Sequence, residues 1–260
     1  MDPLDFVTNL AHAAAELLRD RFDDRHDVVE KKRHDLVTEA DRASEEAIVA
    51  AIRAAFPTAA ILGEEGGVYA GTGDERFIVD PLDGTTNYAH RYPLFCVSIA
   101  YERRGVVEAA AIEAPLMEMR FAAGRRRGAT LNGEPIRVSA TGTVGSALIC
   151  TGFNPADYDR NGRYFAAMSR LAQGVRRDGS AALDLALVAA GRFDAFWEWG
   201  LKPWDVAAGA LLIAEAGGSV TAIDGSALDI ADGSIAASNG LLHAEFCAAL
   251  LATPLTITQG

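Results

Sequence analysis

Apolar side chains recur along this chain at two spacings, which predict helices and strands. Residues 4–22 and 38–56 carry apolar side chains three or four positions apart, as an amphipathic helix does, and Pro57 ends the second segment. A short apolar run at 59–62 predicts a strand that leads into the turn 63–66, GEEG. The chain therefore begins with two helices followed by a sheet.

Strand-like segments make up the next part of the chain. They lie at 76–80, 94–104, 106–114, 117–123 and 128–133. No long helix is expected between them, and tight turns such as GRRRG separate them. This pattern is typical of an antiparallel meander.

From about residue 145 the pattern changes to an alternation of strands and helices. Helices are expected at 156–172, 181–191, 203–217 and 241–252, with short strands between them. Two sheets that are each covered by helices predict an α+β fold, a layered α-β-α-β-α sandwich. We expect an antiparallel N-terminal sheet in residues 1–144 and a mixed C-terminal sheet in residues 145–260, with one active site shared by the two halves.

Composition and charge narrow the classes of partner. The chain has 260 residues and a net charge of −12 at pH 7, which argues against binding the phosphates of nucleic acids. A small phosphorylated substrate stays possible, because bound cations reverse the local field of an acidic pocket. Cys96, Cys150 and Cys247 lack CxxC spacing and are expected to be free thiols. The acidic N-terminal segment and the lack of an apolar run of about 18 residues predict a cytoplasmic protein without membrane contact.

Acidic residues stand at turns beside the apolar strands. They are Glu64 in LGEEG, Asp80 and Asp83 in DPLDGTT, and Asp205 in KPWDVAAG. Acids at strand and helix ends can converge on one crevice, where open α/β sheets place their ligands. Carboxylates packed together repel one another unless a cation compensates, and hard oxygen ligands of this kind suit Mg²⁺ or Mn²⁺.

The segment 80–86, DPLDGTT, combines metal-binding and phosphate-binding features. The proline stiffens the turn, so that the two acids are held on one side with the Leu82 carbonyl between them. The glycine allows a close approach of the backbone to a ligand. Asp83 or Thr85 is expected to cap a short helix that runs through Tyr88, whose free N–H groups then face an anion.

The segment shares part of its pattern with three other features. Asp-x-x-Asp-Gly alone also occurs as a simple capped turn. A helix–loop–helix calcium site does not fit, because Arg91 occupies the twelfth position from Asp80, where a glutamate is needed. Phosphatases that form an aspartyl-phosphate carry Asp-x-Asp at the strand end, one residue closer than the spacing here.

Five motifs, in order, resemble the inositol monophosphatase family of metal-dependent, lithium-sensitive phosphatases. They are DLVTEAD (35–41), GEEG (63–66), DPLDGTTNY (80–88), RRDGSAALDLALVAAGRFDAFWE (176–198) and WDVAAGALLIAEAGG (204–218). The resemblance covers nearly the whole chain. It implies up to three Mg²⁺ ions held by these groups: Glu64, Asp80, the Leu82 carbonyl, Asp83 and Asp205.

The resemblance also implies roles in catalysis. Glu64 and Thr85 would orient a metal-activated water, Asp41 would accept the Thr85 hydroxyl, and no covalent intermediate would form. Asp80 would bridge two of the ions. The substrate would contact a set of residues from both halves: Asp83, Gly84, Thr85, Thr86, Gly179, Ser180, Ala181, Glu198 and Asp205.

The segment GSAA and Glu198 match the members of the family that act on inositol phosphates. The implied substrate is therefore a small polyol phosphate such as inositol 1-phosphate. Members that act on histidinol phosphate tend to carry an aspartate where Ser180 stands here. Fructose 1,6-bisphosphate and 3′-phosphoadenosine 5′-phosphate stay open as alternatives.

Two further expectations follow from the resemblance. The family commonly has a lysine where Glu30 stands here, with Lys31 and Lys32 just after it, so lithium sensitivity and the number of bound ions stay open. A homodimer is expected. Some bacterial members act as protein partners of the RNA-synthesis machinery, so an adaptor is the alternative of another class, although the intact set of metal-binding acids favours an enzyme.

Overall fold

The computed structural model describes residues 1–23, 28–32, 35–153 and 158–253, with the backbone alone for 28–32, 35–37 and 158. Its α-helices are α1 (Pro3–Arg21), α2 (Glu39–Ala55), α3 (Thr85–Ala89), α4 (Tyr158–Leu171), α5 (Ala181–Ala189), α6 (Pro203–Glu215) and α7 (His243–Leu251). Two short 3₁₀ helices span Pro115–Met117 and Val144–Ser146. Each long helix predicted from apolar spacing is present, with small differences at its ends.

Eight strands form the first sheet. In spatial order they are β10 (Glu134–Pro135), β9 (Gly128–Leu131), β8 (Met119–Gly124), β7 (Val106–Ala114), β6 (Cys96–Arg103), β5 (Glu75–Asp83), β3 (Ala60–Gly63) and β4 (Gly67–Tyr69). A separate hairpin is formed by β1 (Val28–Lys32) and β2 (Asp35–Thr38). The side chain of Glu30, which stands at the family's usual lysine position, lies outside the described residues.

The prediction that the first sheet is antiparallel is wrong at one pair of strands. β3 and β5 run parallel, with Gly63 opposite Val79. β4 forms a hairpin with β3 at the sheet edge, so the chain returns through residues 70–74 before β5 starts in the direction of β3. The other neighbouring pairs are antiparallel. The first sheet is therefore mixed.

Five strands form the second sheet, which is mixed, as predicted. Their order is β12 (Gly174–Arg176), β11 (Leu148–Thr151), β13 (Ala195–Trp199), β15 (Ser234–Ser238) and β14 (Ser219–Thr221). β11 is parallel to both of its neighbours, whereas β15 is antiparallel to both of its own.

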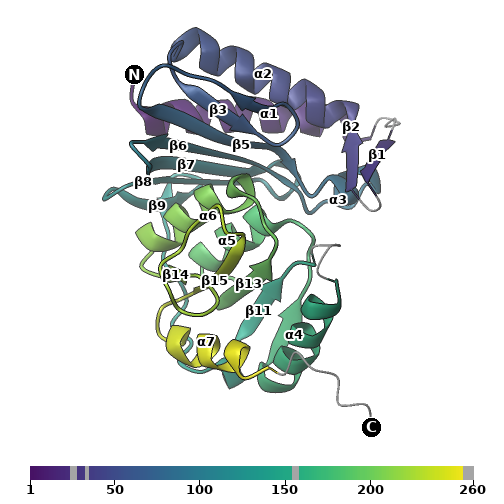
Figure 1. The fold of residues 1–260 in the computed structure, drawn as a ribbon, viewed down its shortest axis with the longest axis vertical. Helices are drawn as coiled ribbons and strands as arrows, with labels where there is room; N and C mark the ends of the chain where they lie inside the picture. The colour runs from purple at the N-terminus through teal and green to yellow at the C-terminus, as the bar shows by residue number, and fades with distance from the viewer. Residues whose placement is uncertain (24–27, 33–34, 154–157, 254–260) are drawn as a thin grey trace.

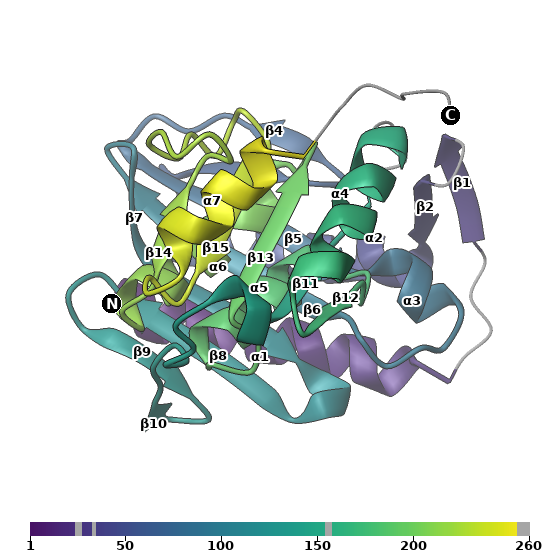
Figure 2. The same cartoon turned by 90° about the horizontal axis from the view of Figure 1, so that it is seen from below.

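The layers stack as the sequence predicts (Figures 1 and 2). α1 and α2 lie on the outer face of the first sheet, α5 and α6 lie between the sheets, and α4 and α7 cover the second sheet. Three hydrophobic cores fill the spaces between these layers, and the largest surrounds α5 and α6. The layered α-β-α-β-α sandwich is confirmed.

The position of α5 and α6 in the middle layer explains why most of their side chains are apolar. Residues 182–189 of α5 are all buried, because the helix has a sheet on each face and α6 beside it. Gly209 of α6 allows the two helices to pack closely, since a Cβ atom there would lie 2.5 Å from the Leu185 Cβ atom. The two halves of the chain therefore share one core.

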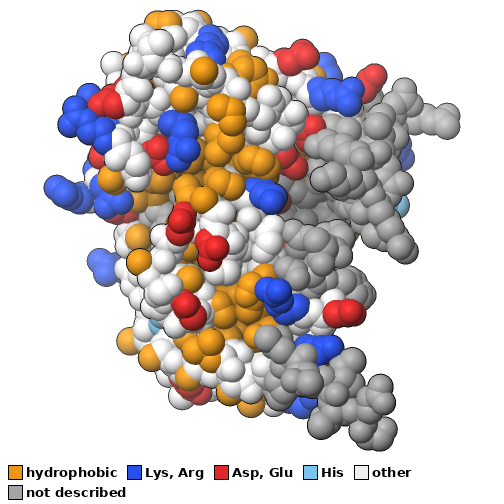
Figure 3. All heavy atoms as spheres, in the orientation of Figure 1, with side chains coloured by type: hydrophobic (Ala, Val, Ile, Leu, Met, Phe, Trp, Pro, Cys, Tyr) orange, Lys and Arg blue, Asp and Glu red, His pale blue; other side chains and the backbone are white. Residues whose placement is uncertain are grey.

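The remaining whole-chain expectations concern thiols and membranes. Cys96, Cys150 and Cys247 are buried free thiols, as predicted. Within the described ranges, no helix has both the length and the apolar character needed to cross a bilayer. On the face drawn in Figure 3, the basic side chains of the described residues are interspersed with acidic ones.

Candidate metal centre and active site

A β-bulge places Asp80 and Asp83 on the same side of β5. Asp80 pairs with Ser98 and Asp83 with Cys96, so β5 has one residue more than β6 between these two pairs. In a regular strand, residues three positions apart point to opposite faces. The extra residue resets this alternation, which brings the second acid to the face of the first.

The strand register also brings Glu64 to the two aspartates. β3 ends at Gly63, which pairs in parallel with Val79 of β5, so the next residues along the two strands are Glu64 and Asp80. A side-chain hydrogen bond joins the two carboxyl groups. The parallel pair that the sequence did not predict is thus the feature that completes the acidic cluster from the N-terminal half.

Asp205 enters the cluster from the C-terminal half. It is the third residue of α6, where its carboxylate accepts the backbone N–H of Lys202 at 2.6 Å. The Ser98 hydroxyl, which lies opposite Asp80 on β6, donates to the Trp204 carbonyl at 3.2 Å and ties the start of α6 to the first sheet. One carboxylate oxygen of each of Asp80, Asp83 and Asp205 lies within 4.8 Å of the others.

Burial and mutual repulsion make this cluster suited to a cation. Asp80 is 1% exposed, and burial raises its pKa well above the usual range, with the charges of Glu64, Asp83 and Asp205 raising it further. Burial and the charge of Asp83 raise the pKa of Asp205 to about 7. Four acids that all offer oxygen atoms form a donor set that Mg²⁺ accepts, and a bound cation would remove the repulsion.

The carboxylate of Asp83 is also held by the N-terminus of α5. It accepts the Ser180 hydroxyl at 2.6 Å and the backbone N–H of Ala182 at 2.7 Å. Burial raises the pKa of Asp83, and these hydrogen bonds act in the opposite direction because they stabilise the charged form. One end of the metal cluster is therefore anchored in the C-terminal half.

The prediction that Asp83 or Thr85 caps the short helix α3 is wrong. Gly84 stands at the N-cap with φ 95°, and no side chain caps the helix. Positive φ at this position favours glycine, because other residues are strained there. Asp83 turns away from α3 and caps α5 instead.

Thr85 and Asp41 lie together, although 44 positions separate them. The Thr85 hydroxyl lies 3.0 Å from an oxygen of Asp41 and 3.2 Å from the Leu82 carbonyl. The other carboxylate oxygen of Asp41 accepts the backbone N–H and the hydroxyl of Thr38, which forms a capping box at the start of α2. Burial raises the pKa of Asp41, while the bonds from Thr38 and Thr85 lower it.

Glu198, which is expected to contact the substrate, is a buried carboxyl group. Glu198 is 4% exposed, and its Oε2 atom has no hydrogen-bond partner among the described residues. Burial raises the pKa of Glu198 well above its usual value, and the charges of Asp205 and Asp83 raise it further. The Glu198 carboxyl therefore lies within electrostatic range of the acidic cluster. A Cβ atom on Gly152 would lie 2.1 Å from Oε2, so the backbone approaches this carboxylate closely at a residue without a side chain.

The turn before α5 contacts the expected site through its backbone. Gly179 has φ 87°, and the Asn87 amide donates to the Asp178 carbonyl at 2.8 Å, which fixes this turn against α3. The Ser180 hydroxyl is engaged by Asp83, and Ala181 begins the helix. Thr86 is exposed on α3.

Some polar residues at this site were missed by the sequence analysis. Ser44 and Glu45 of α2 are buried and bind the backbone around the acidic cluster. Both residues lie on the same core face of the helix as Ile48. A polar residue at a position where the helical spacing expects an apolar one was the signal in the sequence that could have identified them. Asp184 of α5 is also fully buried, with no hydrogen-bond partner for either carboxylate oxygen within the described part of the chain.

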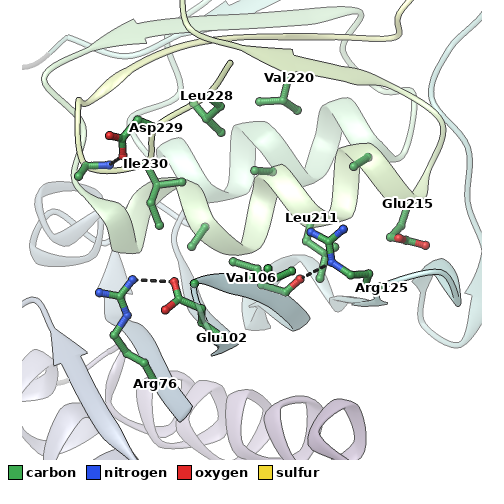
Figure 4. Close-up of a pocket in the computed structure, with 16 residues that line it drawn as sticks. Arg76, Glu102, Val106, Arg125, Leu211, Glu215, Val220, Leu228, Asp229 and Ile230 are labelled. Atoms are coloured by element: carbon green, nitrogen blue, oxygen red, sulfur yellow. Dashed lines mark hydrogen bonds and ion pairs between the residues drawn. The ribbon is translucent and has the colours of Figure 1, made fainter. Parts of the chain in front are cut away.

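A surface pocket lies apart from the acidic cluster. It measures about 570 Å³ and runs along α6, beside the β6–β7 turn and residues 228–231 (Figure 4). Arg76 and Glu102 form an ion pair of 2.6 Å in its wall. None of the acids of the metal cluster lines this pocket.

Comparisons with known proteins agree on one family. The model of the inositol monophosphatase family matches residues 2–254. A Pseudomonas aeruginosa protein named Nus factor SuhB is 47% identical over 247 residues, which cover 91% of each chain. A Synechocystis inositol-1-monophosphatase is 46% identical over 230 residues, covering 86% of this chain and 80% of that protein. The solved inositol monophosphatase of Anabaena (Nostoc) has a TM-score of 0.87 and 43% identity, with 96% of each chain covered.

Proposed function

Because the chain belongs to the inositol monophosphatase family, we propose that it is a Mg²⁺-dependent phosphomonoesterase that hydrolyses a small polyol phosphate, inositol 1-phosphate first. The observation that carries this proposal is the cluster of Glu64, Asp80, Asp83 and Asp205. These buried or half-buried carboxylates come from both halves of the chain and repel one another without a cation.

The metal would be held entirely by oxygen atoms. The donors are the four carboxylates and the Leu82 carbonyl, a set that suits two to three Mg²⁺ ions and also accepts Mn²⁺. The chemistry that Mg²⁺ supplies when bound is a lowered pKa of coordinated water and neutralisation of the phosphate and of the leaving alkoxide.

The attacking water would be oriented by Thr85 and Glu64. If the Thr85 hydroxyl donates its proton to Asp41, 3.0 Å away, its oxygen is left as an acceptor for a proton of the water. Asp41 is itself fixed by Thr38, so the direction of the Thr85 hydroxyl is set before the substrate binds. The water would then attack phosphorus directly as the P–O bond to the alcohol breaks, and the leaving alkoxide would take up the proton that the water loses, so that no covalent enzyme intermediate forms.

The substrate would be held at both of its ends. Backbone N–H groups of Gly84, Thr85 and Thr86 would donate to the phosphate, beside Asp83 and Asp205. The turn Gly179-Ser180-Ala181 would line the alcohol side through its backbone. The Oε2 atom of Glu198, which has no hydrogen-bond partner among the described residues, would accept a hydrogen bond from a hydroxyl group of the substrate, which is the reason for preferring a polyol.

Phosphate release from four esters tests this proposal. Inositol 1-phosphate, histidinol phosphate, fructose 1,6-bisphosphate and 3′-phosphoadenosine 5′-phosphate are each assayed with Mg²⁺ and with EDTA. We expect Mg²⁺-dependent release that is fastest with inositol 1-phosphate. A preference for another ester would keep the metal chemistry and overturn the substrate, whereas no release from any ester would overturn the enzyme.

A second candidate is an adaptor that binds proteins of the RNA-synthesis machinery. The observation in its favour is the relative named Nus factor SuhB, at 47% identity. The two functions separate in the variant Asp80→Asn, which removes one metal-binding acid. Loss of turnover with unchanged protein binding would support two independent roles for the chain.

Lithium inhibition, a cytoplasmic location and a homodimer belong to the same proposal. Sedimentation of the purified protein tests the dimer, and a lithium titration of the Mg²⁺-dependent turnover tests the inhibition. Both measurements are independent of the choice of substrate.

A further inference from the structure

The core-facing side of α2 begins with polar residues. Asp41, Ser44 and Glu45 are at most 3% exposed, and Ile48 and Ile52 continue the same stripe with no exposure at all. Residues three and four positions apart share one helix face, so all of these side chains point toward the first sheet. Burying polar groups costs free energy unless each finds a partner.

Each of these polar residues contacts a different segment that neighbours the acidic cluster. Asp41 contacts the Thr85 hydroxyl. The Ser44 hydroxyl donates to the Pro81 carbonyl at 3.0 Å, within the bulge that separates Asp80 from Asp83. The first two turns of α2 therefore touch the DPLDGTT segment twice.

Glu45 holds the turn that carries Glu64. Its carboxylate accepts the backbone N–H of Glu65 at 2.9 Å and that of Gly66 at 2.6 Å, and the Tyr69 hydroxyl lies 3.3 Å away. Hydrogen bonds from N–H groups to a carboxylate are about twice as strong as neutral ones. The two residues that directly follow Glu64 are thus fixed to α2.

Two glycines pack directly against the carboxylate of Glu45. A Cβ atom on Gly63 would lie 2.7 Å from one Glu45 oxygen, and a Cβ atom on Gly66 would lie 2.5 Å from the other. The glycines on both sides of Glu64 therefore let the backbone close onto Glu45. The turn that carries Glu64 is therefore packed against the Glu45 side chain.

We propose that Glu45 is a positioning residue for the metal centre: it sets the location of Glu64 relative to Asp80, with Ser44 fixing the Asp80 side from the same helix. This inference rests on the proposed metal-dependent function, because it assigns Glu64 to the metal. Residues that hold metal ligands in place through hydrogen bonds typically matter for the metal itself. Their removal lowers metal affinity or activity by about 10–100-fold.

The test compares Glu45→Gln with Glu46→Gln. Glutamine keeps the size of the side chain but loses the charge and turns an NH₂ group toward one of the backbone N–H donors. Glu46 is the matched control, because it is the next residue on the same helix and is exposed. Mn²⁺ affinity is measured by the loss of the free-ion EPR signal, and turnover is measured against Mg²⁺ concentration.

We expect Glu45→Gln to weaken Mn²⁺ binding by about 10-fold or more and to raise the Mg²⁺ concentration needed for half-maximal turnover by a similar factor. Glu46→Gln is expected to match the wild type. A lower melting temperature with unchanged Mn²⁺ affinity would overturn the proposal, because a purely structural bond to the turn would have that effect alone.

Two further measurements keep the outcome clear. If Glu45→Gln does not fold, as judged by circular dichroism, Ser44→Ala is measured instead, and wild-type Mn²⁺ affinity in Ser44→Ala would overturn the role of α2. If the wild type binds Mn²⁺ but releases no phosphate from any ester, the proposed function fails. The Mn²⁺ affinities of the variants then still decide the role of Glu45.

Discussion

The carboxylate of Asp83 accepts the hydroxyl of Ser180 at 2.6 Å, although the two residues lie 97 positions apart in different halves of the chain. The same carboxylate caps α5 through the N–H of Ala182. A proposed metal ligand of the first half is thus part of a helix terminus in the second half. Metal binding and the association of the two halves are therefore expected to support each other.

Ser180→Ala tests this coupling. The variant loses a hydrogen bond to a buried charged group, which is worth roughly 1.5–3 kcal/mol of unfolding free energy. We expect a lower stability in EDTA and weaker Mg²⁺ binding, measured by denaturant unfolding and by calorimetric titration. The exposed Ser146→Ala serves as the control, with an expected change within about 0.5 kcal/mol. Unchanged Mg²⁺ affinity in Ser180→Ala would separate the α5 cap from the metal centre.

Asp80→Asn tests the repulsion within the acidic cluster. Burial, followed by the charges of Glu64, Asp83 and Asp205, raises the pKa of Asp80, the most buried of the four acids. Asparagine removes this ionisable group and its share of the repulsion, so the melting temperature in EDTA is expected to rise by a few degrees. The rise in melting temperature on adding Mg²⁺, and the turnover, are expected to be lost. Asp232→Asn, an exposed acid, should behave as the wild type in both buffers. A melting temperature that falls in EDTA would show that Asp80 stabilises the metal-free fold.

The layers of this fold follow from the apolar pattern, whereas the exact assembly of the site does not. Apolar spacing located α1, α2, α5 and α6, because long helices in a layered protein must bury at least one face. The parallel pairing of β3 with β5 was not predictable, since it depends on which strand the chain reaches after the β4 hairpin. That pairing is what sets Glu64 beside Asp80.

The candidate acids were identified from their positions at strand ends and from the family motifs. The residues that hold these acids in place were not identified, because each such contact joins residues that are distant in sequence. Asp83 or Thr85 was expected to cap the helix that follows, and Asp83 caps α5 instead because the bulge turns its side chain toward the second half. The role of Glu45 was not predicted, because a glutamate in a helix is usually exposed. Its burial follows from the packing of α2 against the first sheet, which the sequence does not show.

Thr85→Ala tests the orientation of the attacking water. The Thr85 hydroxyl contacts Asp41 and the Leu82 carbonyl, and its side chain is not among the proposed metal ligands. We expect turnover to fall by about 10²-fold or more, within the range that a general acid–base contact supplies, while Mg²⁺ affinity stays near that of the wild type. A large loss of Mg²⁺ affinity would instead make Thr85 a metal ligand. Thr130→Ala, on β9 away from the cluster, is the control.

Glu198→Gln tests the choice of substrate. Only a polyol phosphate offers hydroxyl groups to the Oε2 atom, so kcat/KM for inositol 1-phosphate is expected to fall about 10-fold or more. Turnover of an aryl phosphate, which lacks such hydroxyls, is expected to change little. Equal losses on both substrates would remove Glu198 from substrate recognition. Glu134→Gln, at an exposed position on the edge strand β10, provides the control.

Asp184→Asn tests the buried carboxyl that has no hydrogen-bond partner among the described residues. Burial, followed by the charge of Asp178, raises the pKa of Asp184 well above its usual value. The folded protein therefore holds a proton that the unfolded chain has lost, and the unfolding free energy falls as the pH rises from the unfolded pKa of about 3.9 through the folded pKa. The neutral asparagine lacks this dependence. In EDTA at pH 8 we expect the variant to be more stable than the wild type by about 1 kcal/mol or more, the equivalent of one pKa unit, with the gap closing toward pH 4. Denaturant unfolding at a series of pH values measures this gap, and a gap that stays constant with pH would show that Asp184 has the same pKa in the folded and unfolded states.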